Sequence, residues 1–343
     1  MKLAVVLFNL GGPDSLEAVE PFLRNLFGDP AILSLPGIVR WPLSRLLARR
    51  RAPVAREIYA KLGGSSPIVP ETQAQARALD KVLVERGLDA KSFIAMRCWH
   101  PFSDGAVAAA KAWGADRIVL LPLYPQFSTT TSASSFADWD RAAKKGGLSV
   151  PATRVCCYPE HHDFIAASAD VVRETLKAKK PGVGYRLLLS AHGLPKRTVA
   201  KGDPYQWQVE RTAAAIVEAL GIDGLDWKVC YQSRVGPLEW IGPATDAEIR
   251  RAGAEGKGVI VAPIAFVSEH SETLVELDIE YAHLAKAVGV ADYLRAPAVG
   301  THPRFIAALA DLVVRASRSR ATISAGEGRL CPQGFGACPH LPA

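Results

Sequence analysis

The chain alternates short apolar runs, rich in β-branched residues, with alanine-rich segments of helical pattern. Two of the helical segments are residues 104–115 and 207–220. The apolar runs are KLAVVLFNL at 2–10, FIAMRCW at 93–99, RIVLLPLYP at 117–125, YRLLLSAHG at 185–193 and VIVAPIAFV at 259–267. Strands that are apolar throughout must be buried on both faces, and a parallel sheet flanked by helices buries them in this way. The alternation therefore predicts an α/β fold with parallel sheets.

The apolar runs fall into two groups, which predicts two Rossmann-like domains, each a parallel sheet flanked by helices. A length of 343 residues also exceeds what one ordinary core accommodates. The polar, glycine-containing stretch 141–151 lies between the two groups, where a linker is expected. The expected division is residues 1–145 for the first domain, 146–300 for the second, and 301–343 for a C-terminal helix and an irregular, cysteine-containing tail.

Composition excludes several classes of protein. No apolar run reaches the roughly 18 residues of a membrane-spanning helix, and the N-terminal sequence lacks the cleavage region of a secretory signal. We therefore expect a globular protein of the cytoplasm. In that compartment cysteines are expected as thiols and not as a disulfide framework. The cysteines are Cys98, Cys156, Cys157, Cys230, Cys331 and Cys338.

Arginines cluster between Arg40 and Arg56, interleaved with Trp41, Leu46 and other apolar residues, although the net charge of the chain is only +7. This mixture suits an anionic partner, such as lipid headgroups, nucleic acid or a carboxylated ligand. It is equally typical of a solvated helix end whose arginines lie along apolar surface. Nucleic acid is disfavoured, because no nucleic-acid-binding motif accompanies the cluster and the aromatic residues are too few for base stacking.

The residues that follow each apolar run are the candidates for a site, because open parallel sheets bind ligands at the carboxyl ends of their strands. The first run is followed by NLGGPD at 9–14, which is not GxGxxG and is weak evidence for a nucleotide. The other candidates are RCWHP at 97–101, YPQFSTTT at 124–131, SAHGLP at 190–195 and the acidic segment that starts at residue 268.

His192 has two interpretations. A lone histidine after a strand is more often a packed or hydrogen-bonding residue than a catalyst. Its place at the end of LLLS favours a functional role, as do Gly193, which allows close approach, and Pro195, which fixes the exit of the chain. A neutral imidazole there could bind Fe(II) or accept a proton near pH 7.

The segment SEHSETLVELDIEY at 268–281 reads as a helix with Leu274, Leu277 and Tyr281 toward the core. A neighbouring face then carries three glutamates at i,i+4 spacing, which are Glu272, Glu276 and Glu280. Each pair of like charges costs about 0.2–0.5 kcal/mol when solvated and more when buried. A solvated acidic face is one interpretation. The other is a row of carboxylates that passes cations in or protons out, because the row begins where a strand ends.

Six segments together resemble the ferrochelatase family of bacterial type, whose members insert Fe(II) into protoporphyrin IX in the last step of protohaem synthesis. They are LFNLGGPDSLEAVEPFLRNLF, ARRRAPVAREIYAKLGGSSPI, LPLYPQFSTTTSASS, LSAHGLP, YQSRVGPLEWIGPATDAEI and FVSEHSETLVELDIEY. They keep the family's order along most of the chain, and the combination of SAHGLP with SEHSETLVELDIEY is highly specific. The resemblance implies the class II chelatase fold.

The resemblance also implies roles for individual residues. His192 matches the active-site histidine and Glu272 the glutamate that faces it, and the two would contact Fe2+. An acidic path along a partly π-wound helix is matched by His270, Glu276 and Glu280. The positions implied to contact the porphyrin are Leu10, Arg51, Tyr59, Ser66, Tyr124 and Trp240. Residues 32–51 match the hydrophobic lip of the pocket, which touches the membrane in some members.

The implied activity is that of a metal chelatase with Fe2+ and protoporphyrin IX as substrates and protohaem as product. A monomer or homodimer is expected in the cytoplasm, with peripheral contact to the inner membrane through residues 32–51 and no nucleic-acid partner. Three alternatives stay open: a ferrochelatase that acts on coproporphyrin, a chelatase that inserts another metal such as cobalt into related tetrapyrroles, and a non-catalytic porphyrin or metal carrier. A carrier needs a pocket but no proton acceptor, so the pairing of His192 with Glu272 favours an enzyme.

The cysteines depart from the family pattern. Many members hold a 2Fe-2S cluster through three C-terminal cysteines and one from the body of the chain. This tail has Cys331 and Cys338, with Gln333 where a third cysteine is expected, and Cys157 or its neighbour Cys156 is the candidate for the distant ligand. Three thiolates fall short of the usual four unless a histidine of the tail, His340, or a solvent ligand completes the set. The sequence therefore favours a lost or vestigial cluster over an intact one.

Overall fold

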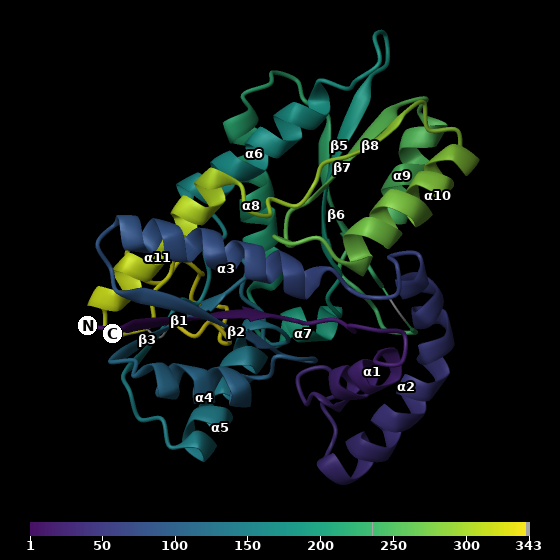
Figure 1. Cartoon of the computed structure of the whole chain (residues 1–343). Helices are drawn as coiled ribbons and strands as arrows, with labels where there is room; N and C mark the ends of the chain where they lie inside the picture. The colour runs from purple at the N-terminus through teal and green to yellow at the C-terminus, as the bar shows by residue number, and fades with distance from the viewer. Residues whose placement is uncertain (235, 341–343) are drawn as a thin grey trace. The chain divides into compact units, whose positions relative to one another are not determined.

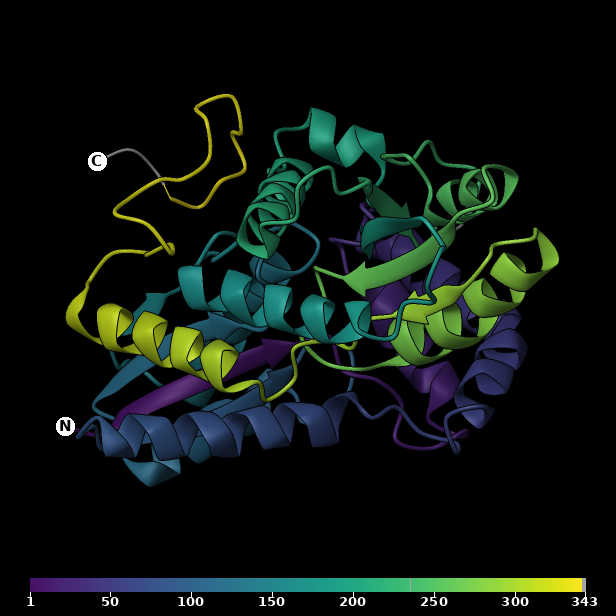
Figure 2. The ribbon, with the colours of Figure 1, turned by 90° about the horizontal axis from the view of Figure 1, so that it is seen from above.

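The structure, a computed structural model, describes residues 1–234 and 236–340 and divides into two compact units (Figures 1 and 2). Unit 1 comprises Met1–Cys157 and Leu309–Gly328. Unit 2 comprises Tyr158–Ala308 and the tail that starts at Arg329. The last three residues of the predicted C-terminal segment lie outside the described residues.

Unit 1 is built on a four-stranded parallel sheet with the strand order β2-β1-β3-β4. The strands are β1 (Leu3–Asn9), β2 (Ala90–Met96), β3 (Arg117–Pro122) and β4 (Ala152–Arg154). The helices are α1 (Val19–Gly28), α2 (Gly37–Ala60), α3 (Ile68–Glu85), α4 (Ser103–Trp113), α5 (Ser132–Gly146) and the second half of α11 (Pro303–Arg318).

Helices cover both faces of this sheet, which explains why every residue of β1 is buried. Helices α4 and α5 lie on one face and α3 lies on the other (Figure 1). On the first face, Phe8 of β1 packs edge-on against Phe136 and Trp139 of α5, with ring centroids 5.8 and 6.2 Å apart. Edge-to-face pairs of this kind add to the stabilisation from apolar burial.

Unit 2 repeats the plan with the strand order β6-β5-β7-β8, again all parallel. The strands are β5 (Tyr185–His192), β6 (Trp227–Gln232), β7 (Gly258–Pro263) and β8 (Tyr293–Arg295). The helices are α6 (His162–Leu176), α7 (Lys196–Ala200), α8 (Tyr205–Leu220), α9 (Thr245–Ala254), a π-helix η1 (Glu272–Glu280) and α10 (Tyr281–Ala287). Helices α9 and α10 pack on one face of the sheet, and α6 and α8 lie on the other (Figure 1).

The α/β fold and the two parallel sheets are as predicted, and all five predicted strands are present. Three further strands, β4, β6 and β8, do not follow from the apolar pattern. Strands β4 and β8 have three residues each. Strand β6 lies at a sheet edge and exposes Lys228, so its sequence lacks a continuous apolar run. Edge strands escape a search for buried ones because they need not be apolar throughout.

The two units differ from the expected division at residues 145 and 300. Unit 1 continues to Cys157, because β4 pairs with β3 beyond the predicted linker. The predicted C-terminal segment is shared between the units. Residues 309–328 belong to unit 1, where Ile323 forms a parallel bridge with Val155 directly after β4.

The strand order places a topological switch point at the end of β5. The chain leaves β5 for β6 on one side and then crosses to β7 on the other, so the crossovers diverge above the carboxyl ends of β5 and β7. Ligands of doubly wound sheets bind at this point. His192 is the last residue of β5, and the segment that leads to the π-helix follows β7. No helix of the described residues is long and apolar enough to cross a membrane.

Gly253, in the last turn of α9, tests the packing of α9 against α10. A Cβ atom there would lie 2.3 Å from the carbonyl oxygen of Val288. We expect Gly253→Ala to lower the free energy of unfolding by about 1–3 kcal/mol, because backbone atoms must shift. Gly105 of α4 is the matched control, since nothing lies within 4 Å of its Cβ position.

Gly105→Ala should raise the free energy of unfolding by about 0.4–1 kcal/mol, because alanine restricts the unfolded chain. Urea denaturation followed by circular dichroism measures both changes. Equal effects of the two substitutions would contradict the close contact at Gly253.

Candidate active site

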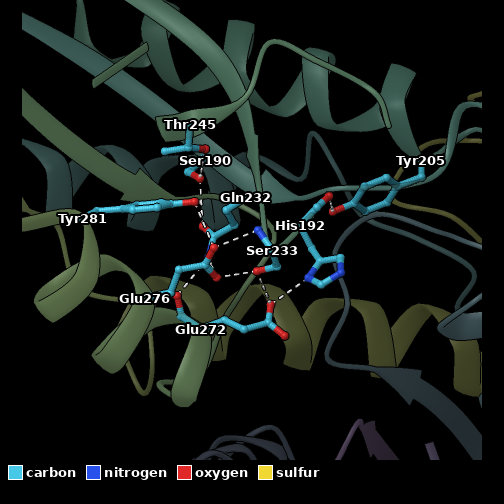
Figure 3. Close-up of polar contacts among 9 residues, drawn as sticks. All are labelled: Ser190, His192, Tyr205, Gln232, Ser233, Thr245, Glu272, Glu276 and Tyr281. Carbon is cyan, nitrogen blue, oxygen red and sulfur yellow. Dashed lines mark hydrogen bonds and ion pairs between the residues drawn. The ribbon is translucent and has the colours of Figure 1, made fainter. Parts of the chain in front are cut away.

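His192 and Glu272 are in direct contact at the switch point of the unit 2 sheet. Nδ1 of His192 lies 2.7 Å from Oε2 of Glu272, the first residue of the π-helix (Figure 3). The two side chains are 41% and 29% exposed, so both are partly withdrawn from water and still reachable. Tyr205 fixes the backbone here, because its hydroxyl donates a 3.1 Å hydrogen bond to the His192 carbonyl.

Gly193 lets the chain pass close to its neighbours directly after His192. A Cβ atom at this position would lie 3.0 Å from the Gln232 carbonyl oxygen and 3.2 Å from the Trp240 ring. The loop of Trp240 is joined to this segment by a β-bridge to Pro195. The structure therefore places Trp240, a predicted porphyrin contact, beside the residue that follows His192.

Electrostatic coupling sets the protonation of the His192 and Glu272 pair. Burial alone would lower the pKa of His192, but the Glu272 carboxylate outweighs burial and raises that pKa above its usual value. Burial alone would raise the pKa of Glu272, but the charge of His192 and its hydrogen bond lower that pKa to about 2. Each group therefore favours the charged form of the other, and the two groups titrate as a pair.

Glu276 is held by hydrogen-bond donors from three residues (Figure 3). Its Oε1 accepts from the Ser233 backbone N–H at 2.8 Å and from the Tyr281 hydroxyl at 2.9 Å. Its Oε2 accepts from the Ser233 hydroxyl at 2.5 Å and from Gln232 Nε2 at 3.1 Å. Burial and the charge of Glu272 nevertheless raise the pKa of Glu276. The two neighbouring carboxylates thus have pKa values displaced in opposite directions.

The helix that carries these glutamates is π-wound from Glu272 to Glu280, as the family resemblance predicted. The N–H of Tyr281 bonds to the carbonyl of Glu276, a spacing of five residues. This winding changes the buried face. Leu277 and Tyr281 pack into the core as predicted, but Leu274 is only half-buried. Thr273 and Val275 are buried, which the α-helical spacing did not predict.

Strand β8 supports the π-helix from its side. Arg295 donates to both Asp278 carboxylate oxygens, at 2.8 and 2.6 Å, and to Glu269 at 2.6 Å. The Tyr293 hydroxyl donates to the Leu277 carbonyl at 2.7 Å. These bonds hold the π-helix on either side of its first turn and give one of its carbonyl groups a partner outside the helix. Bidentate arginine–carboxylate pairs of this type are among the more rigid side-chain contacts.

His270 and Glu280, the other predicted members of the acidic path, lie at opposite ends of the π-helix. His270 is half-buried, and its ring packs against Phe266 with centroids 4.6 Å apart. Burial lowers its pKa, which keeps this imidazole neutral. Its Nδ1 atom is buried and has no hydrogen-bond partner among the described residues. Glu280 ends the π-helix and is exposed.

The other predicted porphyrin contacts belong to unit 1. Leu10 and Tyr124 follow β1 and β3, the adjacent strands at the switch point of that sheet. Leu10 packs on the same apolar cluster that contains Tyr59. Ser66 closely approaches the first loop, since a Cβ atom on its neighbour Gly12 would lie 2.5 Å from the serine. Arg51 is exposed on α2.

The cysteines proposed as cluster ligands are divided between the two units. Cys157 belongs to unit 1, whereas Cys331 and Cys338 lie together in unit 2. The Cys331 sulfur also lies 3.1 Å from Nε2 of Gln208. Within residues 1–234 and 236–340, no group of three or more His, Cys, Asp or Glu side chains could hold a metal ion. The tail of unit 2 therefore supplies two thiolates, which do not by themselves fit a 2Fe-2S cluster, because such a cluster needs four ligands.

Sequence reasoning missed Gln232 and Ser233. Both follow the apolar part of β6, and the rule that pointed to His192 would have pointed to them if β6 had been recognised as a strand. Ser233 also has a φ of 59°, the left-handed region, and it is the sole residue other than glycine with a positive φ in the described part of the chain. Such a conformation costs about 1–3 kcal/mol and marks functional sites more often than average backbone.

Comparison with known proteins identifies relatives across the whole chain. The family model described as Ferrochelatase matches residues 2–317. The protein named Ferrochelatase from Phenylobacterium zucineum is 55% identical over 341 residues, which covers 98% of this chain and 98% of that protein. Ferrochelatase from Caulobacter vibrioides (strain NA1000 / CB15N) is 53% identical over 342 residues and covers 98% of this chain and 97% of its own length.

Solved structures with the same fold are more distant in sequence. The sirohydrochlorin chelatase SirB from Bacillus subtilis subspecies spizizenii, in complex with cobalt, matches with a TM-score of 0.53 and 14% identity. The match covers 92% of this chain and 95% of that chain. SirB from Bacillus subtilis with Fe3+ matches with a TM-score of 0.52 over 93% of this chain and 96% of that chain, also at 14% identity. These likenesses establish a shared chelatase fold.

Glu272→Gln tests the coupling at the pair. Removing the carboxylate charge should lower the pKa of His192, because burial then outweighs the remaining attraction. The pH dependence of the His192 imidazole chemical shift, measured by NMR and assigned with a His192 variant, gives this pKa directly. Glu280→Gln is the matched control on the exposed end of the same helix, and it should leave the pKa of His192 unchanged. An unaltered His192 titration in Glu272→Gln would show that the two groups are not coupled.

Proposed function

This chain belongs to the ferrochelatase family, and we propose that His192 and Glu272 are the residues at which it inserts Fe2+ into protoporphyrin IX. The observation that carries this proposal is the 2.7 Å contact between Nδ1 of His192 and Oε2 of Glu272 at the carboxyl end of β5. The reaction forms protohaem and releases the two pyrrole protons. It needs a proton acceptor and a metal ligand at one place, and an imidazole paired with a carboxylate supplies both.

The pair accepts the pyrrole protons in this proposal. Contact with Glu272 occupies Nδ1 of His192, so Nε2 is the atom that faces the porphyrin nitrogens. Glu272 raises the pKa of His192, which strengthens the imidazole as a base. The proton must then leave before the next turnover. The Glu272 carboxylate contacts the imidazole, and the Ser233 hydroxyl contacts both Glu272 and Glu276.

Fe2+ enters as a substrate. Imidazole nitrogen and carboxylate oxygen both suit Fe2+. Because their mutual contact uses Nδ1 and Oε2, the pair would bind iron through Nε2 of His192 and Oε1 of Glu272. Two protein ligands hold a metal ion less tightly than a complete protein cage, which suits an ion that must pass to the porphyrin nitrogens.

The porphyrin is proposed to contact Leu10, Arg51, Tyr59, Ser66, Tyr124 and Trp240. Apolar and aromatic side chains suit the faces of a flat macrocycle, and Leu10, Tyr124 and Trp240 are of this kind. Arg51 and the hydroxyls of Tyr59 and Ser66 suit its propionate groups, with the guanidinium giving a charge-assisted contact. Contacts remote from the metal that bend the macrocycle would lower the barrier to metal entry.

Two functions compete with this proposal: insertion of iron into coproporphyrin, and transport of a porphyrin or a metal without catalysis. Coproporphyrin carries propionates where protoporphyrin carries vinyl groups, so the two substrates differ in charge at these positions. A carrier would bind either porphyrin without changing its spectrum on addition of metal. Insertion of Fe2+ or Zn2+ into protoporphyrin, compared with insertion into coproporphyrin and followed by absorbance, separates all three functions.

His192→Ala should lower kcat for metal insertion by about 100-fold or more, because it removes a positioned general base. Binding of protoporphyrin, measured by quenching of protein fluorescence, should stay close to that of the unaltered chain. His283→Ala is the matched control, since His283 is exposed on α10. Wild-type turnover in His192→Ala would overturn the assignment, whereas lost turnover in both variants would indicate a general loss of folding.

A peripheral membrane contact through residues 32–51 belongs to the same proposal. Helix α2 has a buried side with Ala48 and Ala52 against α1. Its other side exposes apolar residues, with Ile38 at 87% and Trp41 at 58% exposure. Arginines are interleaved with these residues, and such a combination binds anionic lipid surfaces. Protoporphyrin is poorly soluble in water, so docking at a lipid surface would bring the chain to its substrate.

Replacing both Ile38 and Trp41 by Asp should weaken binding to vesicles that contain phosphatidylglycerol by roughly tenfold or more, since two apolar side chains lose their burial in lipid. Sedimentation of the protein with vesicles measures the affinity. Val84→Asp on α3 is the control, because Val84 is an exposed apolar residue of the same unit outside α2. Equal vesicle binding by the wild type, the double variant and Val84→Asp would argue against a membrane contact through α2.

A further inference from the structure

Ser233 lies between the two carboxylates of the site. Its hydroxyl oxygen is 3.3 Å from Oε2 of Glu272 and 2.5 Å from Oε2 of Glu276 (Figure 3). We propose that Ser233 is a positioning and relay residue that passes protons from Glu272 to Glu276 during metal insertion. The inference rests on the proposed function, because it gives a route for protons that the His192 and Glu272 pair has taken from the porphyrin.

The backbone of Ser233 adopts a left-handed conformation at this position. Its φ of 59° is one that glycine adopts without steric cost, whereas a serine there is strained. The conformation aims the backbone N–H at Oε1 of Glu276, 2.8 Å away, and the hydroxyl at Oε2 of the same carboxylate. The strained backbone thus lets Ser233 make two hydrogen bonds to Glu276, and its hydroxyl also contacts Glu272.

Ser233 differs from the other donors to Glu276 in what its hydroxyl can do. The backbone N–H of Ser233 and the amide of Gln232 can only donate at these contacts. A hydroxyl can accept one proton while it donates another, and among the donors to Glu276 the hydroxyls belong to Ser233 and Tyr281. Of these two, Ser233 contacts Glu272. Its hydroxyl is therefore the group suited to carry a proton between the carboxylates.

Gln232 fixes the geometry of this bridge. Its Nε2 donates to the Glu272 carbonyl at 2.9 Å and to Oε2 of Glu276 at 3.1 Å. Its Oε1 accepts from the Ser190 hydroxyl at 2.8 Å, and that hydroxyl contacts Thr245 at 3.0 Å. Gln232, Ser190 and Thr245 are fully buried, so this chain of hydrogen bonds holds the amide in one orientation.

The transfer conserves atoms and charge. Protonated Glu272 gives its O–H proton to the Ser233 oxygen, while the Ser233 O–H proton moves to the Glu276 carboxylate. Serine is unchanged, Glu272 is again a carboxylate and Glu276 is a carboxylic acid, and no further reactant is required.

Ser233→Gly separates the relay from a structural role. Glycine relieves the backbone strain and keeps the N–H bond to Glu276, so thermal stability should be equal or higher. The single-turnover rate of Zn2+ insertion into protoporphyrin should fall by about tenfold or more, because the transfer loses its hydroxyl. Affinity for protoporphyrin should change less than twofold, and the solvent deuterium isotope effect on the rate should change, which a merely structural residue would not cause.

Ser233→Thr is the conservative partner of this variant. It restores a hydroxyl but adds a branched side chain at a positive φ, so it should be less stable than the wild type and still recover most of the rate lost in Ser233→Gly. A rate that follows stability instead of the hydroxyl would overturn the relay. So would a Ser233→Gly variant with wild-type rate and isotope effect. If the wild-type chain itself inserts no metal, the proposed function fails, and that result is distinct from either outcome.

Discussion

The rest of the site depends on two partly buried carboxylates, those of Glu272 and Glu276, near the carboxyl ends of β5 and β6. A carboxylate that is buried without compensation costs several kcal/mol or changes its protonation. Glu272 is compensated by the charge of His192, and Glu276 by donors from Gln232, Ser233 and Tyr281. The pKa of Glu272 is lowered and that of Glu276 is raised, so Glu276 is the more easily protonated of the two carboxylates.

The surrounding backbone is shaped to meet this requirement. The π-wound segment brings Glu272 and Glu276 to one side of the helix, and β8 supports it through Arg295 and Tyr293. The left-handed conformation of Ser233 directs its N–H and hydroxyl to Glu276. A wide helical turn and a strained residue are both unfavourable by themselves. Their stabilisation by neighbouring strands lets the chain maintain an arrangement that local preferences would not select.

Much of this architecture could be predicted from the sequence, and the exceptions have two physical causes. Buried strands such as β1 and β5 are continuous apolar runs, so the sheets and the position of His192 followed from them. Strand β6 lies at an edge, where Lys228 can face water, and its sequence carries no such run. Gln232 and Ser233 were missed with it. The burial of Thr273 could not be predicted because α-helical spacing does not apply to a π-helix.

The sequence by itself determined the α/β class, the two parallel sheets, a histidine at the end of one strand and a glutamate-rich helix after another. These properties depend on local composition and spacing, which are written directly in the order of residues. Only the tertiary structure decided that His192 and Glu272 touch, that Ser233 bridges Glu272 to Glu276, and that Arg295 supports the π-helix. Each of these contacts joins residues from different elements, and its distance depends on how strands and helices pack, which no local pattern specifies.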